Sequence, residues 1–516
     1  MKRTRKIAWV ALILYVLPVL ACNLPVGPNA RPPEGDAAAD PALQRTQAAQ
    51  LFPLPTLTPP APGEPTPGGP VLSPLDPDVL PFGDLPYTYF AQSGDTLAAV
   101  AARFQVAPEA ITSGEPLPAQ GLLRVGQALV MPSPFPPSAY PNALFPDSEI
   151  IYGPSAADFN VAAYVAQAGG HLAAYSEMVD NETLSGAQII QKVATETSTN
   201  PRLLLAVLEH QSGWVTGAAR NPQPQYPIGF SVASYQGLAR ELSLTARYLS
   251  QGYYGWRAGT FLELKFISGE GVRVSPQLNA GTVAVQHLYT QLLDRPAWEQ
   301  ALYGGAGLVQ TYTALFGDPW ERAALAGPIF PDGIQPPPLT LPFARGQAWS
   351  LTGGAHIAWG VGSPMGAIDL APVTGEKPCA VSATWALAAA PGVIARSERA
   401  GVALDLDGDG NEQTGWVLFY YHMAREGRVA AGTLVLQDGV IGHPSCEGTR
   451  ATGTHLHLTR KYNGEWLPLD GIIPFVLSGW TAHAGQKAYE GTLTRDDQVV
   501  TAHPDGEHGA LIMRDD

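Results

Sequence analysis

The residues that could do chemistry are concentrated in a short run near the C-terminus, Gly453–Leu458, which reads Gly-Thr-His-Leu-His-Leu. Side chains of a β-strand alternate between two faces, so His455 and His457 would share one face while the leucines occupy the other. Two neighbouring imidazoles on an apolar strand suit a metal ion and the water that it activates. The alternative is a pair of surface histidines, and the run alone leaves both interpretations open.

Further histidine and aspartate residues fall where a metal site would need them. His356 follows a pair of glycines and an alanine, and Asp369 comes thirteen residues later in an apolar stretch. His422 ends the apolar run Trp416–Tyr421, which is typical of a buried strand. The whole region from 336 to 486 alternates short apolar runs with glycines and turns, so the sequence predicts an all-β domain there.

In this order, the set resembles the lysostaphin- or LytM-type zinc endopeptidases of bacterial cell walls, most closely the beta-lytic subgroup. The resemblance implies that His356, Asp369 and His457 bind one Zn²⁺ ion. Three protein ligands leave the fourth position of the metal for water. The resemblance further implies that His455 is the general base and that His422 assists it and stabilises the tetrahedral oxyanion. The implied reaction is hydrolysis of a peptide bond in the stem or cross-bridge of peptidoglycan.

An aspartate-rich loop lies within the same predicted domain. Asp405, Asp407 and Asp409 have the one-three-five spacing of a calcium loop, but the twelfth position holds a tryptophan in place of the usual glutamate. Asp-Gly pairs between strands also form hairpin turns. We favour the turn and keep a Ca²⁺ site as the alternative.

The N-terminus reads as an export signal. Four lysine or arginine residues lie within positions 2–6, and the apolar run Ile7–Leu20 is too short for a comfortable membrane span. It ends in Val-Leu-Ala-Cys22, which resembles a bacterial lipobox and implies that residues 1–22 are a lipoprotein signal with a lipidated cysteine. The alternative is an uncleaved anchor helix. Both interpretations predict a membrane-tethered, extracytoplasmic protein.

The three cysteines fit an exported protein. If Cys22 takes the lipid, Cys379 and Cys446 remain as a pair in the C-terminal region. Outside the cytoplasm such a pair is a disulfide candidate, and the alternative is two free buried thiols. A bridge would flank the predicted metal site and pin the loop before His455.

The length and net charge of the chain limit the number of domains and the kinds of partner. The chain has 516 residues, enough for about three domains, and a formal net charge of −15. No basic patch stands out beyond the signal, so a nucleic acid is not an expected partner. Residues 23–84 are rich in proline and have no sustained apolar period, which predicts an extended, semi-rigid linker.

Residues 85–133 have the pattern of a small module. A strand-like run begins at Tyr87, apolar residues at helical spacing follow, and a second strand-like run ends near Pro132. The pattern resembles a βααβ LysM module on the residues Gly94–Leu97, Ala101, Phe104, Val125–Leu129 and Pro132. The resemblance implies binding of N-acetylglucosamine-containing glycans, chiefly peptidoglycan or chitin. Because the central family motif is altered at 111–115, a LysM-shaped spacer without sugar binding is the alternative.

Residues 150–330 predict a mostly α-helical domain. Asn200 and Pro201 open one helix as cap and first turn, and the run that follows resembles the opening helix of lysozyme-like lytic transglycosylases. In that family the acid is the glutamate before the serine, but here this position holds Gln211, which cannot transfer a proton. We favour a non-catalytic scaffold or glycan-binding domain. A glycan-cleaving domain that uses Glu209 is the alternative.

The sequence therefore predicts a multidomain α+β protein with a LysM module, a lysozyme-like helical domain, an all-β metallopeptidase domain of the duplicated hybrid motif type, and a polar tail at 487–516. The predicted function is a lipid-anchored zinc endopeptidase that the module holds on peptidoglycan. One alternative is a catalytically inactive peptidoglycan-binding protein that activates other wall hydrolases. Another is a glycan-cleaving enzyme centred on the helical domain.

Overall fold

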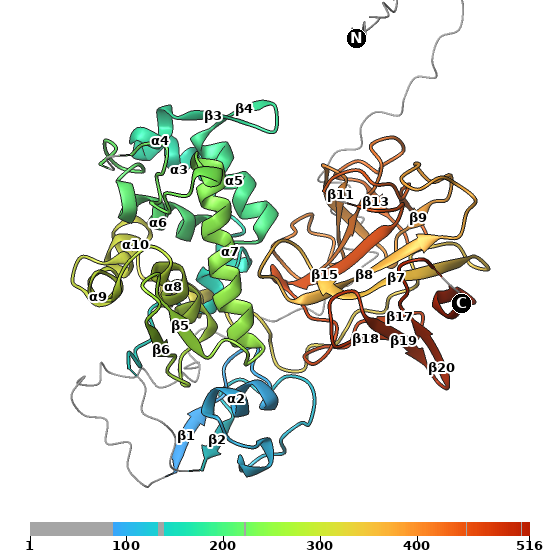
Figure 1. Ribbon diagram of the computed structural model, residues 1–516, viewed down its shortest axis with the longest axis horizontal. Helices are drawn as coiled ribbons and strands as arrows, with labels where there is room; N and C mark the ends of the chain where they lie inside the picture. The colour runs from blue at the N-terminus through green and yellow to red at the C-terminus, as the bar shows by residue number, and fades with distance from the viewer. Residues whose placement is uncertain (1–85, 133–138, 221–222, 450, 507) are drawn as a thin grey trace, which may run out of the picture.

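The computed structural model describes residues 86–132, 139–220, 223–449, 451–506 and 508–516. The predicted signal with Cys22 and the whole proline-rich linker lie outside these residues. Along the chain follow a small module, a helical domain and a mostly β C-terminal domain (Figure 1). Within the described ranges, no helix is both long and apolar enough to cross a membrane.

The N-terminal module pairs its two ends in a small sheet. Strand β1 (Tyr87–Phe90) runs antiparallel to β2 (Ala128–Met131), and helix α2 (Leu97–Phe104) follows β1. Thr96 caps α2 by accepting a hydrogen bond from the Ala99 amide. The expected second α-helix is wrong: a single 3₁₀ turn, η1 (Pro108–Ala110), stands in its place. The chain leaves that turn in an extended conformation because Thr112 pairs with Val130 at the edge of β2.

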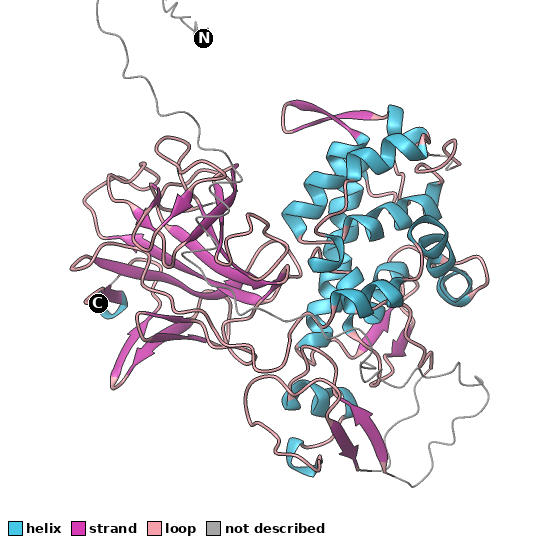
Figure 2. Cartoon of the chain, turned by 180° about the vertical axis from the view of Figure 1, so that it is seen from behind, coloured by secondary structure: helices cyan, strands magenta, loops and turns pink. Residues whose placement is uncertain are grey.

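The helical domain is built from nine α-helices among the described residues, together with two short hairpins (Figure 2). The helices are α3 (Val161–Ala168), α4 (His171–Ala174), α5 (Gly186–Thr197), α6 (Pro201–Ser212), α7 (Leu238–Arg257), α8 (Ala280–Thr290), α9 (Arg295–Tyr303), α10 (Leu308–Phe316) and α11 (Pro319–Ala326). The hairpins are β3 (Ser176–Val179) with β4 (Glu182–Ser185), and β5 (Glu263–Lys265) with β6 (Gly271–Arg273). Helix α6 starts at the predicted Asn200 cap and is buried on nearly all sides, so it is the central helix.

The C-terminal domain is organised around one large antiparallel sheet. Its path is β13 (Leu434–Val435), β10 (Gly392–Glu398), β11 (Gly401–Asp405), β12 (Trp416–Tyr421), β15 (Leu456–Tyr462), β8 (Met365–Pro372), β7 (Ala348–Ile357) and β21 (Leu511–Met513), and β16 (Glu465–Trp466) pairs with β15. Two smaller sheets join β9 (Ala386–Leu387) to β14 (Val440–Gly442), and β17 (Val476–Leu477) through β18 (Trp480–Ala484) and β19 (Gly491–Arg495) to β20 (Gln498–Thr501). The predicted all-β character of this region is confirmed, and Figure 1 shows the sheet beside the helical domain.

The predicted polar tail at 487–516 is wrong, because its residues complete two of these sheets. Strands β19 and β20 extend the small sheet, and β21 forms the edge of the large one beside β7. Leu493 and Ile512 are buried in the core of the domain. The apolar runs in β19, β20 and β21 are only one to three residues long, which is too short a pattern to be recognised from sequence.

The two faces of the large sheet contact different partners. Alternate residues of β12, such as Leu418 and Tyr420, lie in the core of the β domain. The intervening residues, such as Phe419 and Tyr421, share a hydrophobic core with the helical domain. Because His457 of β15 pairs directly with Tyr421, it belongs to the face on which the helical domain packs.

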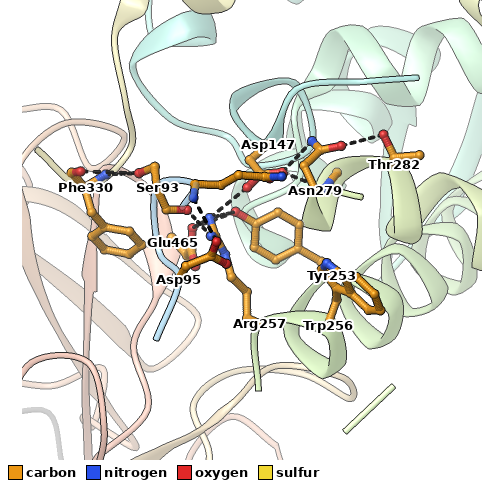
Figure 3. Close-up of polar contacts among 12 residues, drawn as sticks. Ser93, Asp95, Asp147, Tyr253, Trp256, Arg257, Asn279, Thr282, Phe330 and Glu465 are labelled. Carbon is orange, nitrogen blue, oxygen red and sulfur yellow. Dashed lines mark hydrogen bonds and ion pairs between the residues drawn. The ribbon is translucent and has the colours of Figure 1, made fainter. Parts of the chain in front are cut away.

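A single buried guanidinium, that of Arg257 at the end of α7, joins the three parts of the protein (Figure 3). It lies 3.0 Å from the Asp147 carboxylate and 3.1 Å from that of Glu465 in the β domain. It also donates to the Ser93 carbonyl of the module and to the Tyr253 hydroxyl. With a side chain only 10% exposed, Arg257 compensates two carboxylates that are themselves largely buried.

We expect Arg257→Met to lower the free energy of unfolding by about 3–5 kcal/mol, because it leaves buried carboxylates without their cation. Chemical denaturation measures this loss. The matched control is Arg295→Met, whose guanidinium is 37% exposed and paired at the surface, and which should cost less than about 1 kcal/mol. Equal losses for the two variants would contradict the role of Arg257.

Candidate metal centre

The register of three strands gathers the predicted ligands. His457 in β15 stands directly opposite Asp369 in β8. In β7, His356 pairs with Ala367, two residues before Asp369. Residues directly opposite in a sheet share a face, and so do residues two apart on one strand. The three side chains therefore project from the same face of the sheet.

The three side chains meet in a buried cluster. His356 Nε2 lies 3.2 Å from Asp369 Oδ1, His457 Nδ1 lies 3.5 Å from the same oxygen, and the two nitrogens are 2.9 Å apart. Ligand atoms roughly 2.0–2.1 Å from a tetrahedral zinc ion lie about 3.3 Å from one another. The spacing therefore suits an ion of this size.

Backbone carbonyls determine which nitrogen each histidine presents. His356 Nδ1 lies 2.8 Å from the Gly354 carbonyl, and His457 Nε2 lies 2.9 Å from that of Ala358. A carbonyl oxygen can only accept a hydrogen bond, so His356 Nδ1 and His457 Nε2 carry the protons. In the neutral rings, the other nitrogen of each histidine then directs its lone pair toward Asp369. Asp369 Oδ1 is buried and has no hydrogen-bond partner. Three acceptor atoms, one from each side chain, thus converge with no hydrogen-bond donor among them, and a bound cation would satisfy all three.

The protonation states of Asp369 and His457 also suit metal binding. Burial acts to raise the pKa of Asp369, but its contacts with His356 and His457 outweigh burial and hold that pKa well below the usual value. Burial lowers the pKa of His457, which keeps the imidazole neutral. Asp369 outweighs burial at His356 and raises its pKa, so a proton competes with a metal for this ligand.

The other two predicted histidines lie beside the cluster. The rings of His455 and His422 are 4.5 Å apart, and His455 Nε2 lies 3.7 Å from Asp369 Oδ1. Each ring donates its Nδ1 proton to a backbone carbonyl, that of Gly453 for His455 and that of Glu447 for His422. Both rings therefore present Nε2 as an acceptor. Burial and then His455 lower the pKa of His422 to about 4, so its neutral form prevails.

A disulfide braces the segment before His455, as predicted. Cys379 and Cys446 are bonded. Next to the bridge, the Ser445 amide donates to the His422 carbonyl at 2.8 Å. The Thr454 hydroxyl donates to the Ala380 carbonyl at 2.6 Å. The bridge thus joins two segments that contact the backbone at His422 and next to His455.

Tyr489 is a residue of the site that sequence reasoning missed. Its ring stacks on His356 with centroids 4.4 Å apart, and its backbone pairs with both Ala355 and Gly354. Burial and then the charge of Asp369 raise its pKa, so the hydroxyl stays protonated. It lies in the loop between β18 and β19, within the segment expected to be a tail. A lone tyrosine in a polar run carries no sequence signal for this position.

The aspartate-rich loop joins the antiparallel strands β11 and β12, as the turn interpretation requires. Asp405, Asp407 and Asp409 each bring an oxygen within 4.8 Å of the others. Burial and the neighbouring Asp407 raise the pKa of Asp405 to about 9. A Ca²⁺ ion at this loop stays a prediction.

Glu209, the alternative acid of the helical domain, is occupied by structural bonds. Its carboxylate accepts hydrogen bonds from the Val215 amide at 2.8 Å and from the Thr216 amide and hydroxyl. These bonds hold the chain that follows α6, and only 8% of the residue is exposed. A carboxylate committed in this way is poorly placed to donate a proton to a glycan. The geometry therefore argues against glycan cleavage through Glu209.

Known proteins resemble two parts of this chain. A family model described as LasA, N-terminal domain, matches residues 143–329, which cover the helical domain. Protease LasA of Pseudomonas aeruginosa is 28% identical over 344 residues, which are 63% of this chain and 75% of that protein. Beta-lytic metalloendopeptidase of Lysobacter enzymogenes is 27% identical over 172 residues, 32% of this chain and 88% of that protein. The Achromobacter lyticus counterpart is 29% identical over 175 residues, 32% of this chain and 42% of that protein.

These similarities support the expected enzyme class, a metalloendopeptidase. They do not test the resemblances to LysM modules, to lytic transglycosylases or to a lipobox, which stay predictions. The roles of the individual site residues stay predictions as well.

The protein should bind one zinc ion, and Asp369→Ala should weaken its zinc affinity at least about 100-fold, because the cluster loses its only anionic ligand. Competition with a chromophoric chelator measures this affinity. Asp497→Ala, at an exposed position in the β19–β20 turn, is the control and should bind zinc like the parent. An unchanged affinity in Asp369→Ala would show that the metal binds elsewhere.

Proposed function

We propose that this protein is a zinc-dependent endopeptidase that hydrolyses peptide bonds of bacterial peptidoglycan outside the cytoplasm. The observation that carries the proposal is the buried cluster of acceptors on His356, Asp369 and His457, with the rings of His422 and His455 beside it. Similarity to Protease LasA and to beta-lytic metalloendopeptidases supports the reaction class. The substrate is inferred from this similarity together with the LysM-like pattern of the module.

A zinc ion held by the three ligands would supply a water of lowered pKa and would polarise the scissile carbonyl. His455 would serve as the general base of the reaction. Its Nδ1 proton is donated to the Gly453 carbonyl at 2.7 Å, so its Nε2 lone pair is free and lies on the side of Asp369. The side chain is 15% exposed, which leaves it accessible from the substrate side.

For His422 we propose a role other than the one that the sequence resemblance implies. A neutral His422 whose Nδ1 proton is donated to Glu447 cannot also donate from Nε2 to an oxyanion. Its position 4.5 Å from His455 suits a ring that orients the base and shares its proton. Tyr489, whose ring stacks on His356 and whose hydroxyl stays protonated, is the donor that we propose for charge that develops on the substrate carbonyl.

The LysM-like module and the predicted N-terminal signal would bring this chemistry to the wall. A lipid on Cys22 and the proline-rich linker would tether the enzyme, and the module would raise the local concentration of its polymer substrate. Two guanidinium groups hold the module and the helical domain together, so that the two would reach the wall as one unit. Arg257 donates to the Ser93 carbonyl, and Arg103 donates to the Trp256 carbonyl at 3.0 Å, so the module is fixed against the helical domain.

The two histidines of the His-Leu-His run should fail in different ways. His455→Ala should keep zinc and lose about 10²–10⁴-fold in turnover, because only the base is removed. His457→Ala should lose zinc and turnover together, because a ligand is removed. Zinc titration and the release of new free amines from purified peptidoglycan measure the two properties. His171→Ala, in the helical domain, is the control.

The products separate the proposal from its alternatives. New free amines that disappear with a chelator support the endopeptidase. Zinc binding without release of amines would support an inactive wall-binding protein. New reducing ends or anhydro-sugars would point to a glycan-cleaving enzyme. Full activity in both histidine variants would overturn the assignment of this site.

A further inference from the structure

One loop connects the candidate metal centre to the helical domain. It spans residues 358–364, between β7 and β8, and is called here the 358–364 loop. Its first residue, Ala358, contacts the ligand His457, and its tip, around Gly362, contacts helix α7. No residue of α7 is among the predicted metal ligands, and the loop is a segment that contacts both this helix and a ligand.

At the metal end, the loop controls the orientation of His457. The Ala358 carbonyl accepts the Nε2 proton of His457 at 2.9 Å. This bond leaves the Nδ1 lone pair directed at Asp369 and fixes the rotation of the ring. A displaced carbonyl would leave the ring free to rotate or to change tautomer, and the metal would lose a directed ligand.

Three contacts hold the Ala358 carbonyl in place. Ala358 is fully buried, and its amide donates to the Pro364 carbonyl at 2.8 Å, which closes the loop at its base. The Trp359 amide donates to the Ser363 hydroxyl at 2.9 Å, and that hydroxyl donates to the Gly360 carbonyl. These hydrogen bonds make the loop a compact unit. A displacement of its tip therefore also displaces its base, where the Ala358 carbonyl lies.

The Trp359 ring fixes this unit against the sheet. It packs edge-on against Phe419 and Tyr421, with centroids 4.8 and 4.7 Å apart. Trp359 and Ala358 both belong to the hydrophobic core that the sheet shares with the helical domain. The base of the loop is therefore packed by the helical domain as well as by its own sheet.

The tip of the loop lies directly on α7. Gly362 has a φ of 103°. A Cβ atom there would come within 3.0 Å of two backbone atoms of α7, the carbonyl oxygen of Arg247 and the amide nitrogen of Gln251. Gly360, two residues away, has a φ of 70°, but nothing lies within 4 Å of its Cβ position. Both glycines have a positive φ, but that of Gly362 lies further from the left-handed region that other residues adopt, and only Gly362 lies against the helix.

We infer that α7 and Trp359 are positioning elements of the metal centre, because together they hold the Ala358 carbonyl against His457. The inference rests on the proposed function, in which His457 is a zinc ligand. It gives the helical domain a role besides glycan binding or passive support: it completes the outer shell of the metal site. Outer-shell partners of this kind typically account for about 10–100-fold in metal affinity.

The matched pair Gly362→Ala and Gly360→Ala in the full chain tests the contact with α7. Gly362→Ala should weaken zinc affinity about 10–100-fold and change the visible absorption spectrum of the Co²⁺-substituted protein, because the loop must move away from the helix. Gly360→Ala also places a side chain at a positive φ in the same loop, with less backbone strain and without the contact, and should keep the affinity and spectrum of the parent. Chelator competition and absorption spectroscopy measure both properties.

A second pair tests the packing of the loop. Trp359→Ala should weaken zinc binding in the same range, whereas Trp320→Ala, at an exposed position on α11, should not. If Gly362→Ala does not fold, the zinc affinities of Trp359→Ala and Trp320→Ala test the inference in its place. Parental zinc affinity and Co²⁺ spectrum in Trp359→Ala, or in a folded Gly362→Ala, would overturn the inference. If the parent itself binds no zinc, the proposed function fails instead, so the two failures are distinguishable.

Discussion

The pairing register of β15 between β12 and β8 is the constraint on which the candidate site depends. It places His457 directly opposite Asp369 on one side and opposite Tyr421 on the other. A slip of one residue would turn His457 into the apolar core and bring Leu456 or Leu458 to the metal side. The leucines therefore do more than fill the core. Their burial selects the register that presents His455 and His457 together.

The same alternation decides where the helical domain can pack. Both faces of the sheet are apolar, but the face that carries His457 also carries Phe419 and Tyr421, which lie in the core shared with the helices. Burial of this face stabilises the assembly of domains and gives the metal centre walls of low dielectric. Charges that cross the interface, such as that of Arg257, must then be fully paired. This explains why one guanidinium contacts all three parts of the protein.

Electrostatics link the folding of the site to its chemistry. Three acceptor atoms in a buried cluster repel one another, and Asp369 Oδ1 has no donor of its own. Such an arrangement is stable only because neighbouring elements hold each ring by its other nitrogen, through the carbonyls of Gly354 and Ala358. A cation relieves the repulsion, so metal binding and the stability of this end of the sheet are coupled. His422 beside it stays neutral because burial and then the nearby His455 lower its pKa by more than the Asp369 carboxylate raises it.

The sequence alone was sufficient for features that depend on local pattern or residue chemistry. The His-Leu-His alternation, the Asn200 cap of α6, the all-β character of the C-terminal region and the Cys379–Cys446 bridge follow from periodicity, capping and cysteine count. Only the tertiary structure decided the rest. The tail became strands because the sheet edge supplied partners, and Tyr489 reached His356 through a hairpin more than a hundred residues away in the chain. The support of His457 by Ala358, and of that loop by α7, depends on backbone atoms and on packing between domains, and residue types encode neither.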